Sequence, residues 1–374
     1  MKTVTSEQHR DIIIRPATLA DVDTLRGIET TCFGTDQLSR RSFKWMIEKA
    51  NALLLVAEQQ VILGYVLLLY AQGTSLARIY SLAVLPEYRQ QKVAGKLMQQ
   101  AEHAALAAGR SFVRLEVRVD NPTAIALYTK LGYRQFDIVS DYYADHVNAL
   151  RMMKVLQPQP DELPQQVVHY SQSTDFTCGP ASLMMAMKTL QPSLHLDQGL
   201  ELQLWREATT IFMTSGHGGC SAQGLALAAW RRHFDTTLIT NSHDVPFVNS
   251  VRSEDKKTVM QQVHQDFMRQ LDGSTVKQLT QPLDVNLLRE YLNHRALAVV
   301  LISSYRLNRS KSPHWVVLVS ISDRFVYFHD PDIDREDDKT LTDSFYVPVT
   351  HKEFNRMLGY GKPRYQAAVI LHPV

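Results

Sequence analysis

LEVRVDNPTAIALYTKLGY, residues 115–133, gives the strongest indication of the fold of the N-terminal half of the chain. Its first residues continue a run of β-forming side chains that begins at Phe112. From Pro122 to Leu131, apolar side chains return at i+3 and i+4, which indicates a helix. A strand followed directly by a helix is typical of a layered α/β domain.

The same alternation extends outward from this stretch. Strands are predicted at residues 12–15, 53–58, 62–70, 77–85 and 112–117, with a further strand after Tyr133. Helices are predicted at residues 19–32, 40–50, 93–108 and 122–131. Residues 1–155 are therefore expected to form one α/β domain, a mixed sheet flanked by helices.

A second domain is expected after a linker. Residues 153–167 contain three prolines and little apolar periodicity, which places a linker at 156–165. Beyond it, helices are predicted at 179–190, 222–233 and 283–293, followed by strands at 296–302, 314–320 and 324–329. Helices first and a sheet later indicate an α+β domain over residues 166–374.

The composition narrows the class of protein. The chain is 45% hydrophobic and 21% charged, so it can bury two cores. Forty basic and 38 acidic side chains give a net charge of +2 without a basic run, which argues against nucleic acid as a partner. Neither a signal peptide nor a run of about 18 apolar residues is present, so no membrane partner is expected and the cytoplasm is predicted.

Three cysteines, Cys32, Cys178 and Cys220, are widely spaced along the chain. An odd, scattered set builds neither a disulfide framework nor a clustered metal site. At least one of these thiols is therefore free to act as a nucleophile, and no metal is expected.

Residues 79–99 are predicted to run from a strand through a turn into a helix. Such a helix start presents free backbone N–H groups and a positive dipole end, which suits a pyrophosphate. Together with residues 115–133 and the later Asp141-Tyr142-Tyr143, this order resembles the Gcn5-related (GNAT) acetyltransferases over residues 11–155. Within them it is most similar to the ribosomal-protein alanine N-acetyltransferases. The resemblance implies acetyl-CoA as cofactor and a peptide or protein amine as acceptor.

The resemblance also implies roles for single residues. The backbone of Leu82, Ala83 and Val84 would pair with the pantetheine arm. Glu116 matches the general base that takes a proton from the amine, and Tyr128 matches the acid that protonates the departing thiolate. The residues expected to hold the pyrophosphate are Arg89, Gln90, Gln91, Lys92, Val93, Ala94, Gly95 and Asn121.

One residue departs from the family loop. Lys92 stands where the family has a glycine that lets the backbone approach a phosphate. Two interpretations stay open: Lys92 contributes a charge to the phosphate, or it crowds the loop and leaves a non-catalytic domain.

The stretch QSTDFTCGPASL, residues 172–183, carries a second candidate site. Cys178 lies just ahead of a predicted helix, and Pro180 fits the first helical turn, where a missing N–H costs nothing. A cysteine at this position feels the helix dipole, which favours the nucleophilic thiolate. His314 begins a predicted apolar strand and Asp330 ends the next one, so a hairpin can bring the two together as base and orienting group.

These residues resemble the bacteriocin-processing, double-glycine-leader cysteine peptidases of the papain superfamily, over residues 166–335. The resemblance implies a Cys178, His314 and Asp330 triad, with Gln172 as a donor to the oxyanion. The span from Cys178 to His314 is long for this family, and its part at 241–281 is largely polar. No transporter membrane region follows, so specificity for double-glycine leaders is not implied.

The sequence therefore predicts a bifunctional enzyme that acts on peptides or proteins, an N-acetyltransferase fused to a cysteine peptidase. A second interpretation keeps the cysteine domain active and makes the first domain a binding module. A third makes the whole chain a non-catalytic peptide-recognition protein. Hydrolysis and acyl transfer at Cys178 stay open, as do the peptide recognised, the acetyl acceptor and the oligomeric state.

Overall fold

A computed structural model describes residues 11–34, 37–48, 51–156, 167–209, 218–248, 251–309, 312–333, 344–361 and 364–373. The chain divides into two compact units, Met1–Pro160 and Asp161–Val374, and each is described by itself. The predicted linker at 156–165 lies outside the described residues except for its first residue. The predicted domain limits therefore stay a prediction.

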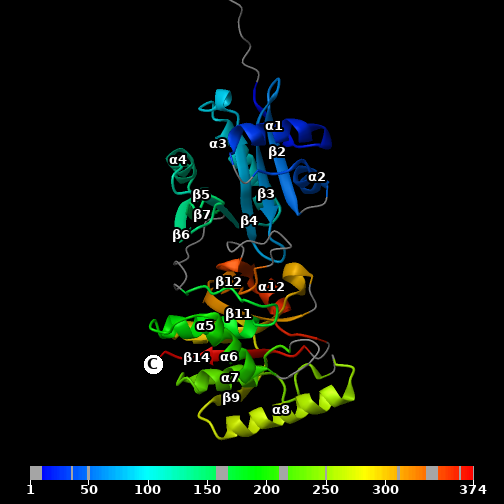
Figure 1. Cartoon of the computed structure of the whole chain (residues 1–374), viewed down its shortest axis with the longest axis vertical. Coiled ribbons are helices and arrows are strands. Elements are labelled where there is room, and N and C mark those ends of the chain that lie inside the picture. The colour runs from blue at the N-terminus through cyan, green and yellow to red at the C-terminus, as the bar shows by residue number, and fades with distance from the viewer. Residues whose placement is uncertain are drawn as a thin grey trace, which may run out of the picture. The chain divides into compact units, whose positions relative to one another are not determined.

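The first unit is built on a seven-stranded sheet of order β1-β2-β3-β4-β5-β7-β6 (Figure 1). Among the described residues, β4 and β5 pair in parallel and the other neighbours pair antiparallel. The strands are β1 (Ile13–Pro16), β2 (Ala52–Glu58), β3 (Ile62–Tyr70), β4 (Leu76–Val84), β5 (Phe112–Arg118), β6 (Arg134–Val139) and β7 (Ala149–Val155). The helices are η1 (Leu19–Asp21), α1 (Val22–Cys32), α2 (Arg40–Glu48), η2 (Pro86–Tyr88), α3 (Val93–Ala107) and α4 (Pro122–Lys130).

Helices lie on both faces of this sheet, which confirms the predicted mixed sheet flanked by helices. The α1 and α2 helices pack on Leu54, Val56 and Leu67 of β2 and β3. The α3 helix packs on the opposite face, where Val113 and Leu115 of β5 join its core. Because side chains alternate along a strand, Glu116 on β5 points away from α3.

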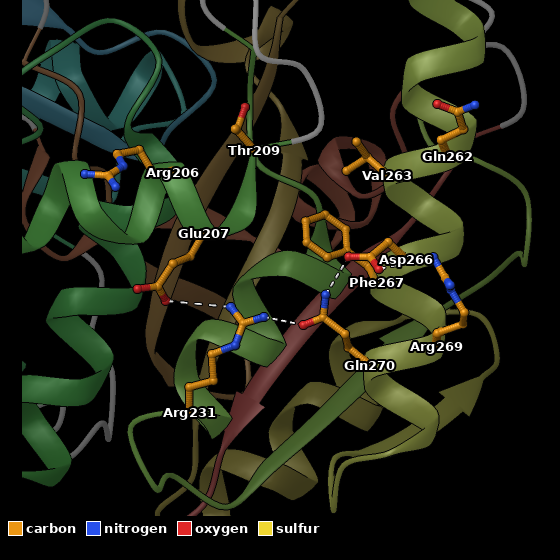
Figure 2. A pocket seen from close by; sticks show the side chains of 10 residues that line it. All are labelled: Arg206, Glu207, Thr209, Arg231, Gln262, Val263, Asp266, Phe267, Arg269 and Gln270. Carbon is orange, nitrogen blue, oxygen red and sulfur yellow. Dashed lines mark hydrogen bonds and ion pairs between the residues drawn. The ribbon is translucent and has the colours of Figure 1, made fainter.

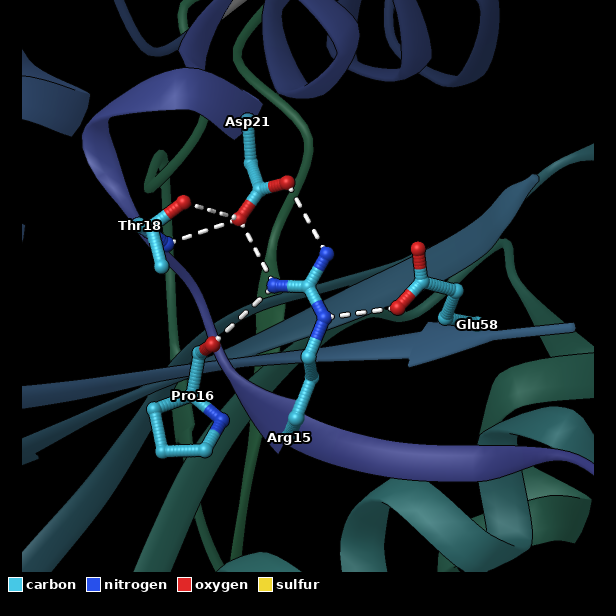
Figure 3. A network of polar contacts seen from close by, with 5 residues as sticks. All are labelled: Arg15, Pro16, Thr18, Asp21 and Glu58. Atoms are coloured by element: carbon cyan, nitrogen blue, oxygen red, sulfur yellow. Dashed lines mark hydrogen bonds and ion pairs between the residues drawn. The ribbon is translucent and has the colours of Figure 1, made fainter. Parts of the chain in front are cut away.

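A polar network fixes the first strand to its neighbours (Figure 3). The guanidinium of Arg15 on β1 lies 2.8 Å from the Asp21 carboxylate and 2.6 Å from that of Glu58 on β2. Asp21 also accepts hydrogen bonds from the backbone N–H and the hydroxyl of Thr18, at 2.7 and 2.9 Å. These contacts hold the start of α1 against the edge of the sheet.

The second unit contains a seven-stranded sheet of order β13-β12-β11-β10-β14-β8-β9. Its strands are β8 (Thr236–Thr240), β9 (Lys277–Thr280), β10 (Leu297–Ser303), β11 (Pro313–Ile321), β12 (Phe325–His329), β13 (Val347–Thr350) and β14 (Ala367–Leu371). Its helices are α5 (Cys178–Leu190), α6 (Gln198–Ala208), α7 (Ala222–Trp230), α8 (Glu254–Asp272), α9 (Val285–Asn293), α10 (Tyr305–Asn308) and α12 (His351–Met357).

The central strands of this sheet are apolar on both faces because helices cover both. The α9 and α12 helices pack on the face that carries Val300 and Val316. The α5 helix packs on the other face, where Ser182 donates a 3.0 Å hydrogen bond to the carbonyl of Trp315. The predicted order of helices before sheet strands holds for α5 to α7 only, because β8 and β9 precede α9 along the chain. The α5 helix packs against β11.

The polar segment at 241–281 is not a plain insertion, because it contains the long helix α8 and the edge strand β9. Met260, Phe267 and Leu271 form a buried stripe along α8, which packs beside α7. Charged side chains cover the rest of the helix, and this high polarity hid it in the sequence.

Candidate active sites

The parallel strands β4 and β5 separate in the first unit. Within the described residues their pairing runs from Leu76 with Phe112 to Ile79 with Leu115, and both strands continue beyond it. The pairing of β3 with β4 also shifts register next to Ile79. The β4 backbone after the shift, which includes Leu82, Ala83 and Val84, therefore has one edge open to another extended chain.

The loop from β4 to α3 folds as a backbone concavity. Gln90 and Lys92 both adopt left-handed conformations, with φ of 65° and 63°. Left-handed residues beside a helix start turn successive N–H groups toward one point, which makes an anion-binding nest. A Cβ added at Gly95 would meet nothing within 4 Å, so the first turn of α3 is open on that side. These features fit the diphosphate of an acyl-CoA.

The lysine departure has a structural explanation at the same loop. Lys92 adopts a positive φ, a conformation that glycine takes without strain, at a cost of about 1–2 kcal/mol. Its side chain is exposed, so it does not fill the concavity from within. Arg89 and Gln91 donate hydrogen bonds to the carbonyls of Val84 and Glu87, at 3.3 and 3.2 Å, and so support the loop.

Glu116 is held by an arginine that the sequence analysis missed. Arg78 on β4 lies 2.8 Å from Glu116 Oε2, and both side chains are 5% exposed. The same guanidinium donates a 2.9 Å hydrogen bond to the hydroxyl of Tyr142. Glu116 Oε1 is buried and has no hydrogen-bond partner among the described residues. One carboxylate oxygen of Glu116 thus remains able to accept a proton. In the sequence, the position of Arg78 inside a predicted apolar strand was the only sign that it has a buried acidic partner.

Tyr128 and Asn121 lie on and before α4. Tyr128 is buried against Tyr133 with ring centroids 5.9 Å apart, and burial raises the pKa of Tyr128 to about 12. A phenol with this pKa keeps its proton at neutral pH and can donate it. Asn121 is the N-cap of α4, where its side-chain oxygen accepts a 3.1 Å hydrogen bond from Ala124 N.

The second site begins at the N-terminus of α5. Cys178 is the first residue of this helix and is partly exposed. A Cβ added at Gly179 would come within 3.2 Å of Trp315 and Leu225 side chains and 3.3 Å of Cys220 Cβ. Gly179 therefore lets the helix start pack directly against β11, and this explains the Cys-Gly pair.

Two residues of neighbouring strands meet beside this helix start. His314 Nε2 lies 2.7 Å from Asp330 Oδ1, with His314 on β11 and Asp330 directly after β12. Their side chains are 10% and 3% exposed. This short hydrogen bond in a dry environment fixes the ring and leaves Nδ1 for other partners.

The charge state of His314 depends on this pair. Burial lowers its pKa, but the Asp330 charge and hydrogen bond oppose burial, aided by a hydrogen bond and charge interaction with Cys178, and they raise the pKa to about 10. The imidazolium is thus the stable form at neutral pH. A cation beside a sulfur favours the thiolate, which is the reactive form of cysteine.

Gln172 belongs to a segment that runs alongside Asp330. The His169 ring lies 2.8 Å from the Asp330 carbonyl, and Gln172 N donates a 2.9 Å hydrogen bond to the carbonyl of Pro331. Gln172 Oε1 is buried and unpartnered among the described residues. The structure thus brings Gln172 next to the segment that carries Asp330.

The other cysteines lie in less reactive surroundings. Cys220 is 3% exposed, and burial with the nearby Cys178 raises the pKa of its thiol well above the usual value. Burial also raises the pKa of Cys32, which lies on α1 in the first unit.

A surface hollow of about 490 Å³ lies between α6, α7 and α8 (Figure 2). It contains none of the predicted site residues. Its polar side chains bind one another, since Arg231 contacts Glu207 and Gln270, and Gln270 donates to Asp266 at 2.6 Å. We assign no chemistry to it. Within the described ranges, no cluster of side chains suits a metal ion and no helix is both long and apolar enough to span a bilayer.

Comparison with known proteins relates each unit to a family. Residues 167–372, more than half of the chain, match the Peptidase_C39 like family. Residues 20–133 match the Acetyltransferase (GNAT) family.

Individual relatives are N-terminal acetyltransferases. The catalytic subunit NAA10 of the N-terminal acetyltransferase A complex of Arabidopsis thaliana is 34% identical over 151 residues, 39% of this chain and 78% of that protein. An N-alpha-acetyltransferase of Saccharolobus solfataricus is 27% identical over 42% of this chain and all of that protein. The ARD1 subunit homolog of Dictyostelium discoideum is 29% identical over 40% of this chain and 76% of that protein.

Solved structures of the same kind overlap part of the chain. The ribosomal-protein-S18-alanine N-acetyltransferase from Escherichia coli aligns with 41% of this chain and 99% of its own, at 22% identity and a TM-score of 0.36. Arabidopsis thaliana NAA60 in complex with acetyl-CoA aligns with 39% and 98%, at 18% identity and a TM-score of 0.36. From the family matches and the NAA10 relative together, the chain belongs to the Peptidase_C39 like family and carries a GNAT N-acetyltransferase domain ahead of its peptidase-like domain.

Proposed function

We propose that the second unit is a cysteine peptidase in which Cys178 is the nucleophile, His314 the acid and base, and Asp330 the orienting group. The observation that carries this proposal is the buried 2.7 Å hydrogen bond between His314 and Asp330 beside the start of α5. It supplies the ion-pair partner that a helix dipole alone does not.

In the proposed reaction, the Cys178 sulfur attacks a peptide carbonyl carbon, and the carbonyl oxygen gains the negative charge. Gln172 and the backbone N–H of Cys178 are the proposed donors to that oxygen. His314 gives its proton to the departing amine, which leaves a thioester on Cys178. His314 then takes a proton from water, whose oxygen attacks the thioester and releases the acid. An amine in place of that water would make the reaction an acyl transfer.

We propose that the first unit transfers an acetyl group to the N-terminal amine of a peptide or protein. Acetyl-CoA, when bound, supplies the acetyl group as a thioester. The β4 backbone at Leu82–Val84 and the loop from Arg89 to Gly95 are the groups that would hold it. Glu116 Oε1 is the proposed acceptor of the amine proton, and the Tyr128 hydroxyl is the proposed proton donor to the departing sulfur.

One experiment tests both activities on the full chain. The wild-type protein is incubated with a peptide library, with and without acetyl-CoA, and new termini and acetylated amines are identified by mass spectrometry. We expect cleavage that disappears in Cys178→Ala and acetylation that disappears in Tyr128→Phe. Cleavage that persists in Cys178→Ala would refute the peptidase assignment, and acetylation unchanged in Tyr128→Phe would refute the role of that residue.

The alternative of a non-catalytic first unit rests on Lys92. The exposed side chain and the left-handed backbone at this position favour an open loop instead. A purely peptide-recognising chain is disfavoured because the close contact between His314 and Asp330 serves no evident recognition purpose. The cytoplasm, as compartment, stays a prediction.

A further inference from the structure

The buried carboxylate of Glu201 binds the segment that precedes the proposed nucleophile, Cys178. Glu201, in the first turn of α6, is fully buried. Its Oε1 accepts a 2.8 Å hydrogen bond from the backbone N–H of Ser173 and a second one from the hydroxyl of Thr177. Its Oε2 accepts a 2.9 Å hydrogen bond from the hydroxyl of Tyr170. Three donors thus converge on one side chain.

The residues that Glu201 binds are sequence neighbours of the proposed catalytic groups. Ser173 directly follows Gln172, and Thr177 directly precedes Cys178. The one carboxylate therefore fixes both ends of the short segment that carries the oxyanion donor and the nucleophile.

The same face of α6 supports the middle of the segment. Trp205 lies one helical turn beyond Glu201, and its ring packs against Phe176 with centroids 5.0 Å apart. The Trp205 indole N–H also donates a 2.8 Å hydrogen bond to Gly218 O. Because residues four apart share a helix face, α6 presents a polar and an apolar contact to one loop.

The hydrogen bond to Thr177 also affects the start of α5. Thr177 is the N-cap of this helix, a position where threonine usually accepts a hydrogen bond from the first turn. Within the described residues its side chain makes no such bond, and its hydroxyl instead contacts Glu201 Oε1 and Thr174, whose carbonyl is 3.1 Å away. The first-turn N–H groups, which include that of Cys178, are thereby left for a ligand.

We propose that Glu201 is a positioning residue that aligns Gln172 and Cys178 for catalysis, a role that rests on the proposed peptidase function. We call Glu201 with Tyr170, Ser173 and Thr177 the Glu201 clamp. A carboxylate suits this task because it only accepts hydrogen bonds and can take all three. A glutamine has a single acceptor oxygen, so its amide N–H group would face either Tyr170, whose hydroxyl would have to accept instead of donate, or the Ser173 N–H and the Thr177 hydroxyl.

The test compares Glu201→Gln with a matched control on the same helix. Glu207→Gln removes a carboxylate that lies 2.7 Å from Arg232, outside the clamp. We expect Glu201→Gln to lower kcat for peptide cleavage about 100-fold, the cost of a small misplacement of reacting groups, with little change in KM. Glu207→Gln should keep the wild-type kcat. A wild-type kcat in Glu201→Gln, or a rise in KM alone, would overturn the proposal.

If Glu201→Gln does not fold, variants of Thr177 test the same hydrogen bond from the other side. Thr177→Val removes the hydroxyl at nearly constant shape and should lower kcat, whereas Thr177→Ser should restore it. When both changes can be combined, Thr177→Val should add little to Glu201→Gln, because the two side chains act as one unit. Equal kcat in Thr177→Val and Thr177→Ser would contradict the clamp.

A separate readout distinguishes failure of the clamp from failure of the proposed peptidase. The rate at which iodoacetamide alkylates Cys178 does not require any peptide substrate. We expect this rate to fall about 10-fold in Glu201→Gln and to stay unchanged in Glu207→Gln. If the wild-type protein cleaves no peptide but the rate falls, the clamp stands and the peptidase proposal fails. An unchanged rate overturns the clamp.

Discussion

His314 binds Asp330 through Nε2, at 2.7 Å, so the ring turns its other nitrogen away from the carboxylate. His314 lies on β11 and Asp330 directly follows the neighbouring antiparallel strand β12, so the hairpin brings the two residues together. With Nε2 held by Asp330, Nδ1 is the nitrogen left to interact with Cys178. The contact with Asp330 raises the pKa of His314, so it also sets the pH at which the imidazolium loses its proton.

Removing the carboxylate should shift the alkaline limit of cleavage. The pKa of His314 is raised to about 10, from a value near 6.5 in the unfolded chain. The imidazolium therefore contributes its full stabilisation of the fold below pH 6.5, and this contribution is lost as the pH rises through about 10. In Asp330→Asn only burial and the sulfur remain. We therefore expect cleavage to decline at a pH several units lower, as measured by kcat/KM against pH.

Asp323→Asn is the control for that profile. Asp323 is an exposed carboxylate in the turn between the same two strands, away from the hydrogen bond. It should reproduce the wild-type profile. An alkaline limit that does not move in Asp330→Asn would contradict the role given to this carboxylate.

Glu116→Gln should reduce stability as well as acetyl transfer. The change removes the carboxylate charge that pairs with the buried Arg78 guanidinium, at an expected cost of about 3 kcal/mol in the free energy of unfolding of the first unit. Chemical denaturation and acetyl transfer are measured on the same variant. Tyr142→Phe, which removes only the neutral partner of Arg78, should cost about 1 kcal/mol. An equal free energy of unfolding in wild type and Glu116→Gln would mean that the ion pair between Arg78 and Glu116 does not stabilise the first unit.

Lys92 variants separate the backbone from the charge. Lys92→Gly should stabilise the first unit by up to about 1 kcal/mol, because glycine adopts positive φ without strain. Lys92→Ala keeps the backbone strain and removes the charge, so it should not stabilise the first unit.

Calorimetry of acetyl-CoA binding to the same variants measures the effect of the charge on affinity. We expect affinity to fall in both variants, and to fall less at high salt. Tighter binding by both variants would instead support crowding by the side chain.

Asp21 should set the acid stability of the first unit. The hydrogen bonds from Arg15, opposed by burial and aided by Thr18, lower its pKa from about 3.8 to about 2. Its contribution is present above the unfolded pKa and is lost as the pH falls through about 2. Asp21→Asn should therefore cost about 1–2 kcal/mol at neutral pH and show a weaker loss of stability between pH 4 and 2. Asp23→Asn, an exposed neighbour, is the control, and an equal loss in both variants would refute the network.

Periodicity was sufficient for the elements with strong apolar patterns. The strands β2 to β5 follow from runs of apolar residues, because most of their positions are buried. The helices α1 to α4 follow from i+3, i+4 spacing. Helix α8 was missed because Met260, Phe267 and Leu271 form a narrow stripe in a highly charged segment. Strands β8 and β14 were missed because short runs of apolar residues do not by themselves distinguish strand from helix.

Some residues of the candidate sites could be predicted from the sequence, and others could not. Cys178, His314 and Asp330 were found because each stands at the end of an element, where a polar residue interrupts an apolar pattern. The pairing of Glu116 with Arg78 could not be read from the sequence, because it depends on the neighbouring positions of two strands that are parallel. Glu201 lies on α6, which was not predicted, and its partners are 24 to 31 residues away along the chain.

The most direct test of the central claim measures the reactivity of all three cysteines in one sample. The full chain is treated with iodoacetamide at neutral pH, and the alkylation rates of Cys32, Cys178 and Cys220 are followed by peptide mapping, in wild type and in His314→Ala. We predict that Cys178 reacts fastest, because burial raises the pKa of both other thiols, and that its rate falls in His314→Ala. Cleavage should be lost in Cys178→Ala and largely kept in Cys32→Ala and Cys220→Ala. Faster labelling of Cys220, or a Cys178 rate that does not depend on His314, would contradict the account.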